Sequence, residues 1–141
     1  MTDPTQKPLH YTPDPDAGFS VDRREDGGMN VTFSEVTHKT LSNWHQFAVE
    51  HLIGSDRLVR NLYDLRQVEE LSDEAIQMAI EVNNDPSTRN IRLAAVVAND
   101  AVRTGMRKII DNTPGGGVRM SIFEDMDQAE AWLIRPMASM V

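Results

Sequence analysis

The pattern of hydrophobic and polar residues in the second half of the chain predicts strands that alternate with helices. Ile91–Ala98 is a nearly unbroken apolar run, which is typical of a strand covered on both faces. Asn99 and Asp100 come directly after this run, and their side chains favour the N-terminus of a helix. We expect a helix over about Ala101–Asp111. Its buried positions are predicted to be Ala101, Val102, Gly105, Met106 and Ile109.

The segment that follows predicts one more strand and one more helix. Val118–Phe123 alternates in polarity as a strand does. Asp125 opens a helix in which Ala129, Trp132 and Leu133 share one face.

The first predicted elements of the chain form an antiparallel hairpin. Phe19–Arg23 and Met29–Phe33 alternate in polarity, and a turn signal at Asp26–Gly28 separates them. The side chains expected in the core are those of Phe19, Val21, Val31 and Phe33.

Two helices and a strand are predicted between this hairpin and Ile91. A helical period runs over about Lys39–Ile53, and Leu58–Leu65 follows as a strand whose polar residues Arg60 and Asn61 suggest incomplete burial. Ser72 is expected to cap the next helix, which ends at Asn83–Pro86. The predicted buried residues of these helices are Leu41, Trp44, Ala48 and Leu52 in the first, and Ala75, Met78, Ala79 and Val82 in the second.

This order of elements predicts an α/β domain with a mixed sheet of about five strands and about four helices. Strands that are joined through a helix run parallel, so only the first strand should be antiparallel. We expect one domain over residues 18–135, a flexible proline-rich tail over 1–17 and a short C-terminal tail over 136–141.

Composition and charge narrow the classes of function. The formal net charge of −8 argues against nucleic-acid binding, because phosphate contacts need a basic face. The chain has no cysteine, which excludes disulfides and thiolate chemistry. It has no apolar run long enough to cross a membrane and no secretion signal, so we expect a cytoplasmic protein.

Three segments resemble the SpoIIAA-like superfamily of STAS domains, and in particular small stand-alone bacterial STAS/SEC14-like proteins. Leu62–Arg66 resembles the third strand of that family, which ends in an Asp-containing turn, and Ile91–Val96 resembles its central strand. Val118–Asp125 with Ala129–Leu133 resembles its last strand and helix. The likeness covers Phe19–Leu133. It implies the SpoIIAA-like fold, and for function either protein binding or, on the SEC14-like side, binding of an apolar small molecule or lipid.

One motif departs from that family. STAS anti-sigma-factor antagonists carry an Asp-Ser-Ser-Gly-like motif whose serine is phosphorylated. The corresponding segment here is Val68–Glu74, in which Ser72 is the only hydroxyl. A phosphate on Ser72 would meet several carboxylates, so we interpret Ser72 as a helix cap and an unlikely phosphorylation site.

The candidate site residues follow the predicted strands, at the edge where open α/β sheets bind ligands. Asp64 and Arg66 could receive a polar ligand or form an ion pair with each other. Asn99 and Asp100 occupy the same edge and are also explained as caps.

A basic side on the third helix is a further candidate. Arg103 and Arg107 are one turn apart and could meet an acidic partner or an anionic head group, or could simply face solvent.

Residues that could support metal or enzyme chemistry do not form a recognisable set. His38, His45 and His51 lie on or near the first helix, but their spacing does not bring three imidazoles together, and His51 is expected to pack near Trp44. We predict no metal and no cofactor, and no catalytic set.

We therefore expect a non-enzymatic module that binds a protein partner or itself. The alternative is a module that binds a small apolar molecule or lipid, because Trp44 and four methionines (Met78, Met106, Met120 and Met126) could line a pocket. A third possibility is an enzyme that uses Asp64, Arg66 or His38.

Overall fold

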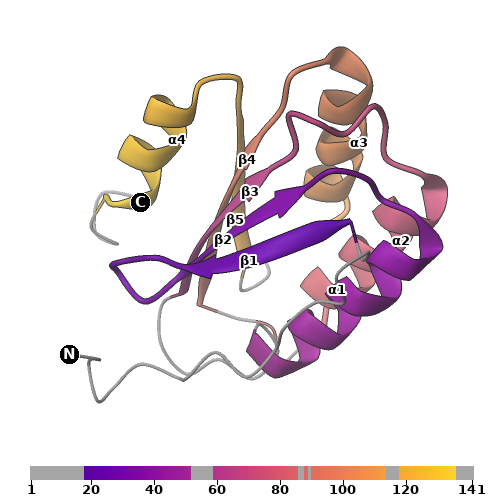
Figure 1. Cartoon of the computed structure of the whole chain (residues 1–141), viewed down its shortest axis with the longest axis horizontal. Helices are drawn as coiled ribbons and strands as arrows, with labels where there is room; N and C mark the ends of the chain where they lie inside the picture. The colour runs from indigo at the N-terminus through magenta and orange to yellow at the C-terminus, as the bar shows by residue number, and fades with distance from the viewer. Residues whose placement is uncertain (1–17, 52–58, 86–87, 89, 114–117, 136–141) are drawn as a thin grey trace.

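The fold is a five-stranded sheet with helices on both faces (Figure 1). The computed structural model describes residues 18–51, 59–85, 88, 90–113 and 118–135. The elements in chain order are β1 (Phe19–Arg23), β2 (Met29–Phe33), α1 (His38–His51), β3 (Val59–Asp64), α2 (Asp73–Asn83), β4 (Ile91–Val96), α3 (Asp100–Asp111), β5 (Val118–Phe123) and α4 (Met126–Leu133). The predicted tails, 1–17 and 136–141, lie outside the described residues, as do Leu52, the end of the predicted first helix and Pro86.

The strands lie side by side in chain order, β1-β2-β3-β4-β5. β1 pairs with β2 in antiparallel fashion, and each later pair is parallel. The predicted mixed sheet, with one antiparallel strand at its N-terminal end, is therefore confirmed.

Three helices cover one face of the sheet and one helix covers the other. Figure 1 shows α1, α2 and α3 together on one side of the strands and α4 on the opposite side. This division follows from the connections, since α1, α2 and α3 each join two neighbouring parallel strands. The helix α4 comes after the last strand and packs on β4 and β3 from the other side.

The two faces have separate hydrophobic cores. The larger core lies under α1–α3 and includes Trp44, Phe47, Tyr63, Leu93 and Met106. The smaller core lies under α4 and consists of Leu62, Ala94, Val96, Ala129 and Leu133. Every residue of β4 is buried, as its unbroken apolar run predicts. β3 is less buried, with Val59, Arg60 and Asp64 half-buried, but the expectation was wrong for Asn61, which is fully buried.

Side-chain caps set where three of the helices begin. The Ser72 hydroxyl accepts a hydrogen bond from Ala75 N, and Asn99 Oδ1 accepts one from Val102 N. Asp125 caps α4 by accepting from Asp127 N and Gln128 N. The cap predictions at Ser72, Asn99 and Asp125 are confirmed, and they explain why the helix boundaries fall close to those expected.

One predicted core position is wrong. Ala101 is exposed, whereas Val102, Gly105, Met106 and Ile109 are buried as expected. These four positions have the spacing of one helix face, and Ala101 lies about 100° around the helix from Val102, on the solvent side.

The hairpin turn between β1 and β2 depends on two glycines. Gly27 has a positive φ of 89°, which favours glycine. A Cβ atom on Gly28 would lie 1.7 Å from the carbonyl oxygen of Arg60, so only glycine allows β2 to enter the sheet at this point.

Candidate functional site

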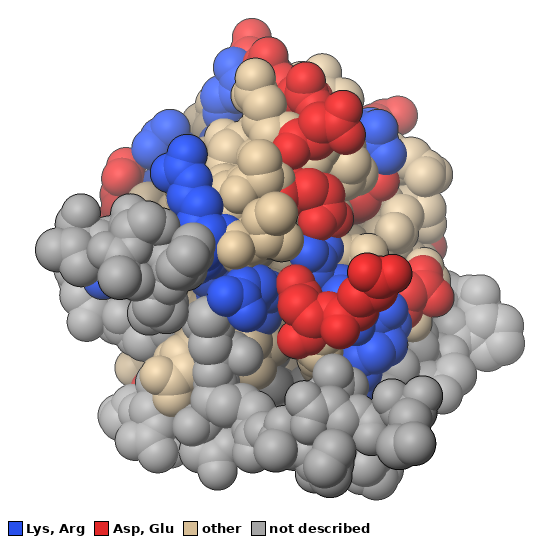
Figure 2. Space-filling model, turned by 90° about the vertical axis from the view of Figure 1, so that its left-hand side faces the viewer, with Lys and Arg blue, Asp and Glu red and all other residues tan. Residues whose placement is uncertain are grey.

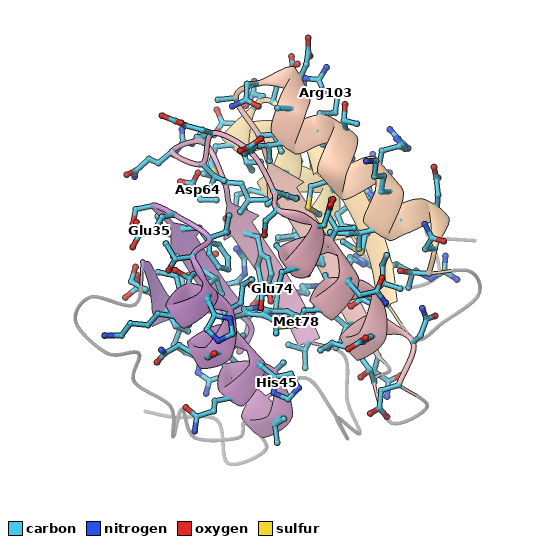
Figure 3. The ribbon with its side chains drawn as sticks, turned by 90° about the vertical axis from the view of Figure 1, so that its right-hand side faces the viewer. Glu35, His45, Asp64, Glu74, Met78 and Arg103 are labelled. Atoms are coloured by element: carbon cyan, nitrogen blue, oxygen red, sulfur yellow. The ribbon has the colours of Figure 1, made fainter. Side chains whose placement is uncertain are left out.

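The candidate residues lie at the edge where the parallel strands end. Asp64 is the last residue of β3, Asn99 follows β4, and Glu124 follows β5. Because β3, β4 and β5 are neighbours in register, their carboxyl ends meet at one edge. We call this the strand-end edge. Figure 3 shows Asp64 and Arg103 toward this edge and His45 toward the opposite end of the molecule.

Asp64 and Arg66 form a fork-shaped ion pair within one turn. Arg66 Nη2 lies 2.8 Å from Asp64 Oδ2, and Arg66 Nε donates to Asp64 Oδ1 at 3.0 Å. The backbone N–H of Arg66 donates to the same Oδ1 at 3.1 Å. These bonds, chiefly the one from the guanidinium, hold the pKa of Asp64 below its usual value. Both residues are therefore engaged with each other, and their role toward a ligand stays a prediction.

Asn99 joins two of the loops at this edge. Its Oδ1 caps α3, while its Nδ2 donates to the Val68 carbonyl oxygen at 3.1 Å in the loop before α2. All of these bonds are structural, so the side chain fixes the relative position of the two loops.

Arg103 is surrounded by carboxylates. Its guanidinium pairs with Asp100 at 3.5 Å on the same helix and with Glu124 at the end of β5. Arg107 is exposed one turn farther along α3, away from the strand-end edge. The basic side predicted for α3 is thus divided, because one of its two arginines belongs to an ion-pair network.

The strand-end edge is mostly acidic. Exposed or half-buried carboxylates end or follow the strands, or lie in the first turns of the helices that start there; they are Glu35, Asp64, Glu69, Glu70, Asp73, Glu74, Asp100, Glu124, Asp125 and Asp127. The positive ends of the α2, α3 and α4 dipoles stabilise those in the first turns. The two described arginines of this edge, Arg66 and Arg103, already bind carboxylates. The edge therefore presents a surplus of negative charge to solvent.

Ser72 lies at this edge as an exposed residue. Its Oγ accepts from Ala75 N at 3.1 Å. Asp73 and Glu74 follow it in the first turn of α2, as the sequence shows. The structure confirms the cap, and phosphorylation of Ser72 stays an untested and disfavoured possibility.

A cavity of about 70 Å³ lies between the sheet and the layer formed by α1–α3. Its lining is almost entirely apolar and includes Trp44, Leu71, Ala79, Met106 and Met120. The polar groups of its wall are largely paired: Trp44 Nε1 donates to the Tyr63 hydroxyl at 3.0 Å. The volume exceeds what one water molecule needs.

The methionine prediction is correct for two of the four residues. Met106 and Met120 line the cavity, but Met78 does not. Met126 packs against the smaller core on the other face of the sheet, because it opens α4 rather than one of the three helices that cover the cavity.

The two histidines whose side chains the structure describes, His38 and His45, do not come together in one site. His38 Nδ1 lies 2.8 Å from Glu74 Oε2, at the surface between α1 and α2, and His45 is exposed. The side chain of His51 lies outside the described residues. No group of three or more histidine or acidic side chains within the described part of the chain is arranged to hold a metal ion.

The sequence analysis did not predict that one group of arginines lies together. Arg60, Arg92 and Arg119 lie opposite one another on β3, β4 and β5. A signal was present, since each of these strands begins with an aliphatic residue followed by arginine. Its meaning depends on strand register, which a single sequence does not provide.

The chain resembles known structures in fold. It superimposes on an uncharacterized protein of the DUF3478 family with a SpoIIAA-like fold from Shewanella loihica PV-4, with a TM-score of 0.54 and 18% identity over 82% of this chain and 91% of that one. It also superimposes on an anti-sigma factor antagonist from Mycobacterium paratuberculosis, with a TM-score of 0.56 and 18% identity over 85% of this chain and 97% of that one. No family model and no curated protein sequence matches the chain. The SpoIIAA-like fold predicted from the sequence is therefore confirmed.

No helix among the described residues has the length and apolar character that a membrane crossing requires.

Proposed function

We propose that this protein is a non-enzymatic regulatory module that binds a protein partner through its acidic strand-end edge. The observation that carries the proposal is the charge of that edge, where carboxylates from four loops gather and the described arginines already pair with carboxylates. The anti-sigma factor antagonist with the same fold supports it, because by its name that protein acts on a protein.

The electrostatics indicate the chemistry of the partner. A surface that carries excess negative charge attracts a basic one and speeds their encounter. We therefore propose a partner with a basic contact surface, rather than the acidic partner considered for Arg103 and Arg107. Arg103 is engaged with Asp100 and Glu124, and this leaves Arg107 and the adjacent Lys108 as the exposed cations farther along α3.

The same contacts argue against the enzyme alternative. Both carboxylate oxygens of Asp64 bind Arg66, and His38 pairs with Glu74 on the neighbouring helix. A general acid or base needs an atom that is free to meet its substrate, and Arg66 holds both carboxylate oxygens of Asp64. We propose that these pairs stabilise loops.

The cytoplasmic location stays a prediction.

A paired capture experiment tests the proposal. The full chain is immobilised in three forms: the natural protein, an edge variant with Glu69→Lys and Glu70→Lys, and a control variant with Glu81→Lys and Asp111→Lys. All four substituted residues are exposed, and each pair changes the net charge by the same amount. Glu81 and Asp111 lie near the C-terminal ends of α2 and α3, away from the strand-end edge.

The captured proteins are then compared at several salt concentrations. We expect a protein that the natural chain and the control retain and that the edge variant loses, with retention that weakens as salt rises. Equal retention by all three forms would contradict the proposal. Sedimentation of the free protein shows whether a second copy of the chain is the partner.

The cavity under α1–α3 supports a second candidate function, the binding of a small apolar molecule. The specific observations are its apolar lining and its volume of about 70 Å³, which is larger than one water molecule needs. Native mass spectrometry of gently purified protein should then show an added mass that Ala79→Met removes, because Ala79 lines the cavity. The matched control is Ala101→Met, at an exposed position on α3. A bare natural protein, or a mass that survives in Ala79→Met, would count against this candidate.

A further inference from the structure

Two polar contacts form part of the wall of the cavity under α1–α3. Trp44 Nε1 on α1 donates to the hydroxyl oxygen of Tyr63 on β3 at 3.0 Å. Asn83 Nδ2 at the end of α2 donates to Met120 Sδ on β5 at 3.3 Å. All four residues line the cavity, so each contact joins the helix layer to the sheet at the cavity wall. Figure 3 looks onto the three helices that cover this space.

The Tyr63 hydroxyl has hydrogen-bonding capacity that these contacts do not use. A phenol hydroxyl both accepts and donates, and the bond from Trp44 uses its oxygen only as an acceptor. Among the described residues, no group accepts the hydroxyl hydrogen of Tyr63. The residue is only 7% exposed, and burial raises the pKa of Tyr63, so the hydroxyl keeps its hydrogen throughout the physiological pH range. A buried donor of this kind costs free energy unless an acceptor reaches it.

The lining indicates that the acceptor is uncharged. Among the described residues that line the cavity none carries a charge, whereas charged side chains of both signs are spread over the α4 side of the molecular surface (Figure 2). A carboxylate or an ammonium group in the cavity would lose its hydration without meeting a partner of opposite charge. A neutral oxygen needs only a hydrogen-bond donor, which Tyr63 supplies.

The volume of the cavity limits the size of a ligand. A cavity of about 150 Å³ holds benzene, so one of about 70 Å³ holds a molecule of roughly three or four non-hydrogen atoms. Val36, Leu71 and Ala79 line the cavity and are only half-buried, so a small solute has a short path to it from solvent.

We propose that the cavity binds a small neutral molecule with an acceptor oxygen, such as a short-chain ketone, aldehyde or alcohol, and that Tyr63 donates a hydrogen bond to that oxygen. The inference rests on the second candidate function, the binding of a small apolar molecule, and it names the chemistry that selects the ligand. The apolar walls contact the carbon atoms, and the hydroxyl distinguishes an oxygen-bearing molecule from a hydrocarbon of the same size. The bond from Trp44 fixes the hydroxyl oxygen, and two hydrogen bonds in series strengthen each other.

The test is an NMR titration of the full chain with acetone, with acetate and xenon as comparison ligands. Acetone and acetate have the same number of non-hydrogen atoms and nearly the same shape, but they differ in charge. Xenon is an apolar ligand that enters small apolar cavities. The chain has two tryptophans, so the indole N–H signals report on both faces of the sheet: Trp44 at the cavity and Trp132 beside the smaller core.

We expect acetone to shift the Trp44 indole signal saturably, with a dissociation constant in the millimolar range, and to leave the Trp132 signal unchanged. Acetate at the same concentration should shift neither signal. Tyr63→Phe should weaken acetone binding about tenfold and leave xenon binding unchanged, because it removes only the hydroxyl. The matched control is Ser42→Ala, which removes an exposed hydroxyl of α1 outside the cavity lining and should bind both ligands as the natural protein does.

Two results would overturn the inference and leave the second candidate function standing. The first is the same acetone affinity in Tyr63→Phe as in the natural protein, with folding of the variant confirmed by circular dichroism. The second is binding of xenon without binding of acetone, or equal binding of acetone and acetate. A natural protein that binds neither xenon nor acetone would remove both the inference and that candidate function. The proposed protein binding at the strand-end edge does not depend on any of these results.

Discussion

Arg24 and Glu130 form a two-pronged ion pair between the β1–β2 hairpin and α4. Arg24 Nη1 lies 2.8 Å from Glu130 Oε1, and Arg24 Nη2 lies 2.8 Å from Glu130 Oε2. The Arg24 side chain is only 6% exposed and the Glu130 side chain 40%. Asp26 also contacts the guanidinium, at 3.1 Å. The pair links α4, the only described helix on that face of the sheet, to the β1–β2 hairpin at the edge of the sheet.

Glu130→Gln should lower the free energy of unfolding by about 1–2 kcal/mol. The nearly buried guanidinium of Arg24 would keep only one carboxylate partner, Asp26, but the exposure of Glu130 reduces the cost below that of a fully buried pair. Urea unfolding measures the change, with Glu25→Gln, an exposed neighbour of Arg24, as the control. A loss no larger than that of the control would show that the pair contributes nothing.

Ser72→Ala should destabilise the protein by about 1 kcal/mol, because the N–H of Ala75 would lose its cap. Ser72→Asp should retain most of the stability, since aspartate is an equally good cap. Thermal or urea unfolding of the two variants makes the comparison. Equal stability of Ser72→Ala and the natural protein would contradict the assignment of Ser72 as a structural cap.

The pair of Asp64 and Arg66 predicts a pH-dependent difference in stability. The pKa of Asp64 is lowered in the folded protein, chiefly by its hydrogen bond with Arg66. A lowered carboxyl pKa stabilises the fold above the unfolded value, which is about 3.9, and this contribution is lost as pH falls through the folded pKa. Arg66→Gln should therefore be less stable than the natural protein at neutral pH, by less than about 1 kcal/mol because Arg66 is half exposed. The difference should disappear in strong acid, and a difference that stays constant down to pH 2 would refute the explanation.

Tyr63→Phe should cost about 1–2 kcal/mol of unfolding free energy. The buried Nε1–H of Trp44 donates to the Tyr63 hydroxyl, and phenylalanine would leave this donor without its acceptor. Trp44→Phe together with Tyr63→Phe should cost less than the sum of the two single changes, because the pair is then removed as a unit. Additive losses in denaturant unfolding would show that the bond carries no coupling energy.

Local chemistry made most of the fold predictable. The capping residues Ser72, Asn99 and Asp125 act on backbone groups two or three positions away, so short segments of sequence are enough to identify them. The buried strand β4 was also predictable from a short segment, because a strand covered by helices on both faces has an unbroken apolar run.

Features that depend on distant contacts were not predictable. Arg24 and Glu130 are 106 positions apart, and the row of Arg60, Arg92 and Arg119 requires knowledge of strand register. The error at Met126 has a similar origin, because nothing in its local pattern shows that α4 lies on the other face of the sheet from α1–α3. The pairing of Arg103 with Glu124 likewise joins two separate elements, and it reduces the positive charge that α3 presents to a partner.

Site-specific photo-crosslinking tests the central claim, that a protein partner binds the acidic strand-end edge, most directly. A photoreactive residue replaces Glu69 at that edge or, as the control, Glu81 near the C-terminal end of α2, and both positions are exposed. After irradiation in a native cell lysate, we expect a cross-linked protein from position 69 that position 81 does not give and that added salt diminishes. Cross-links that are equal at the two positions, or present only at position 81, would contradict the proposed binding edge.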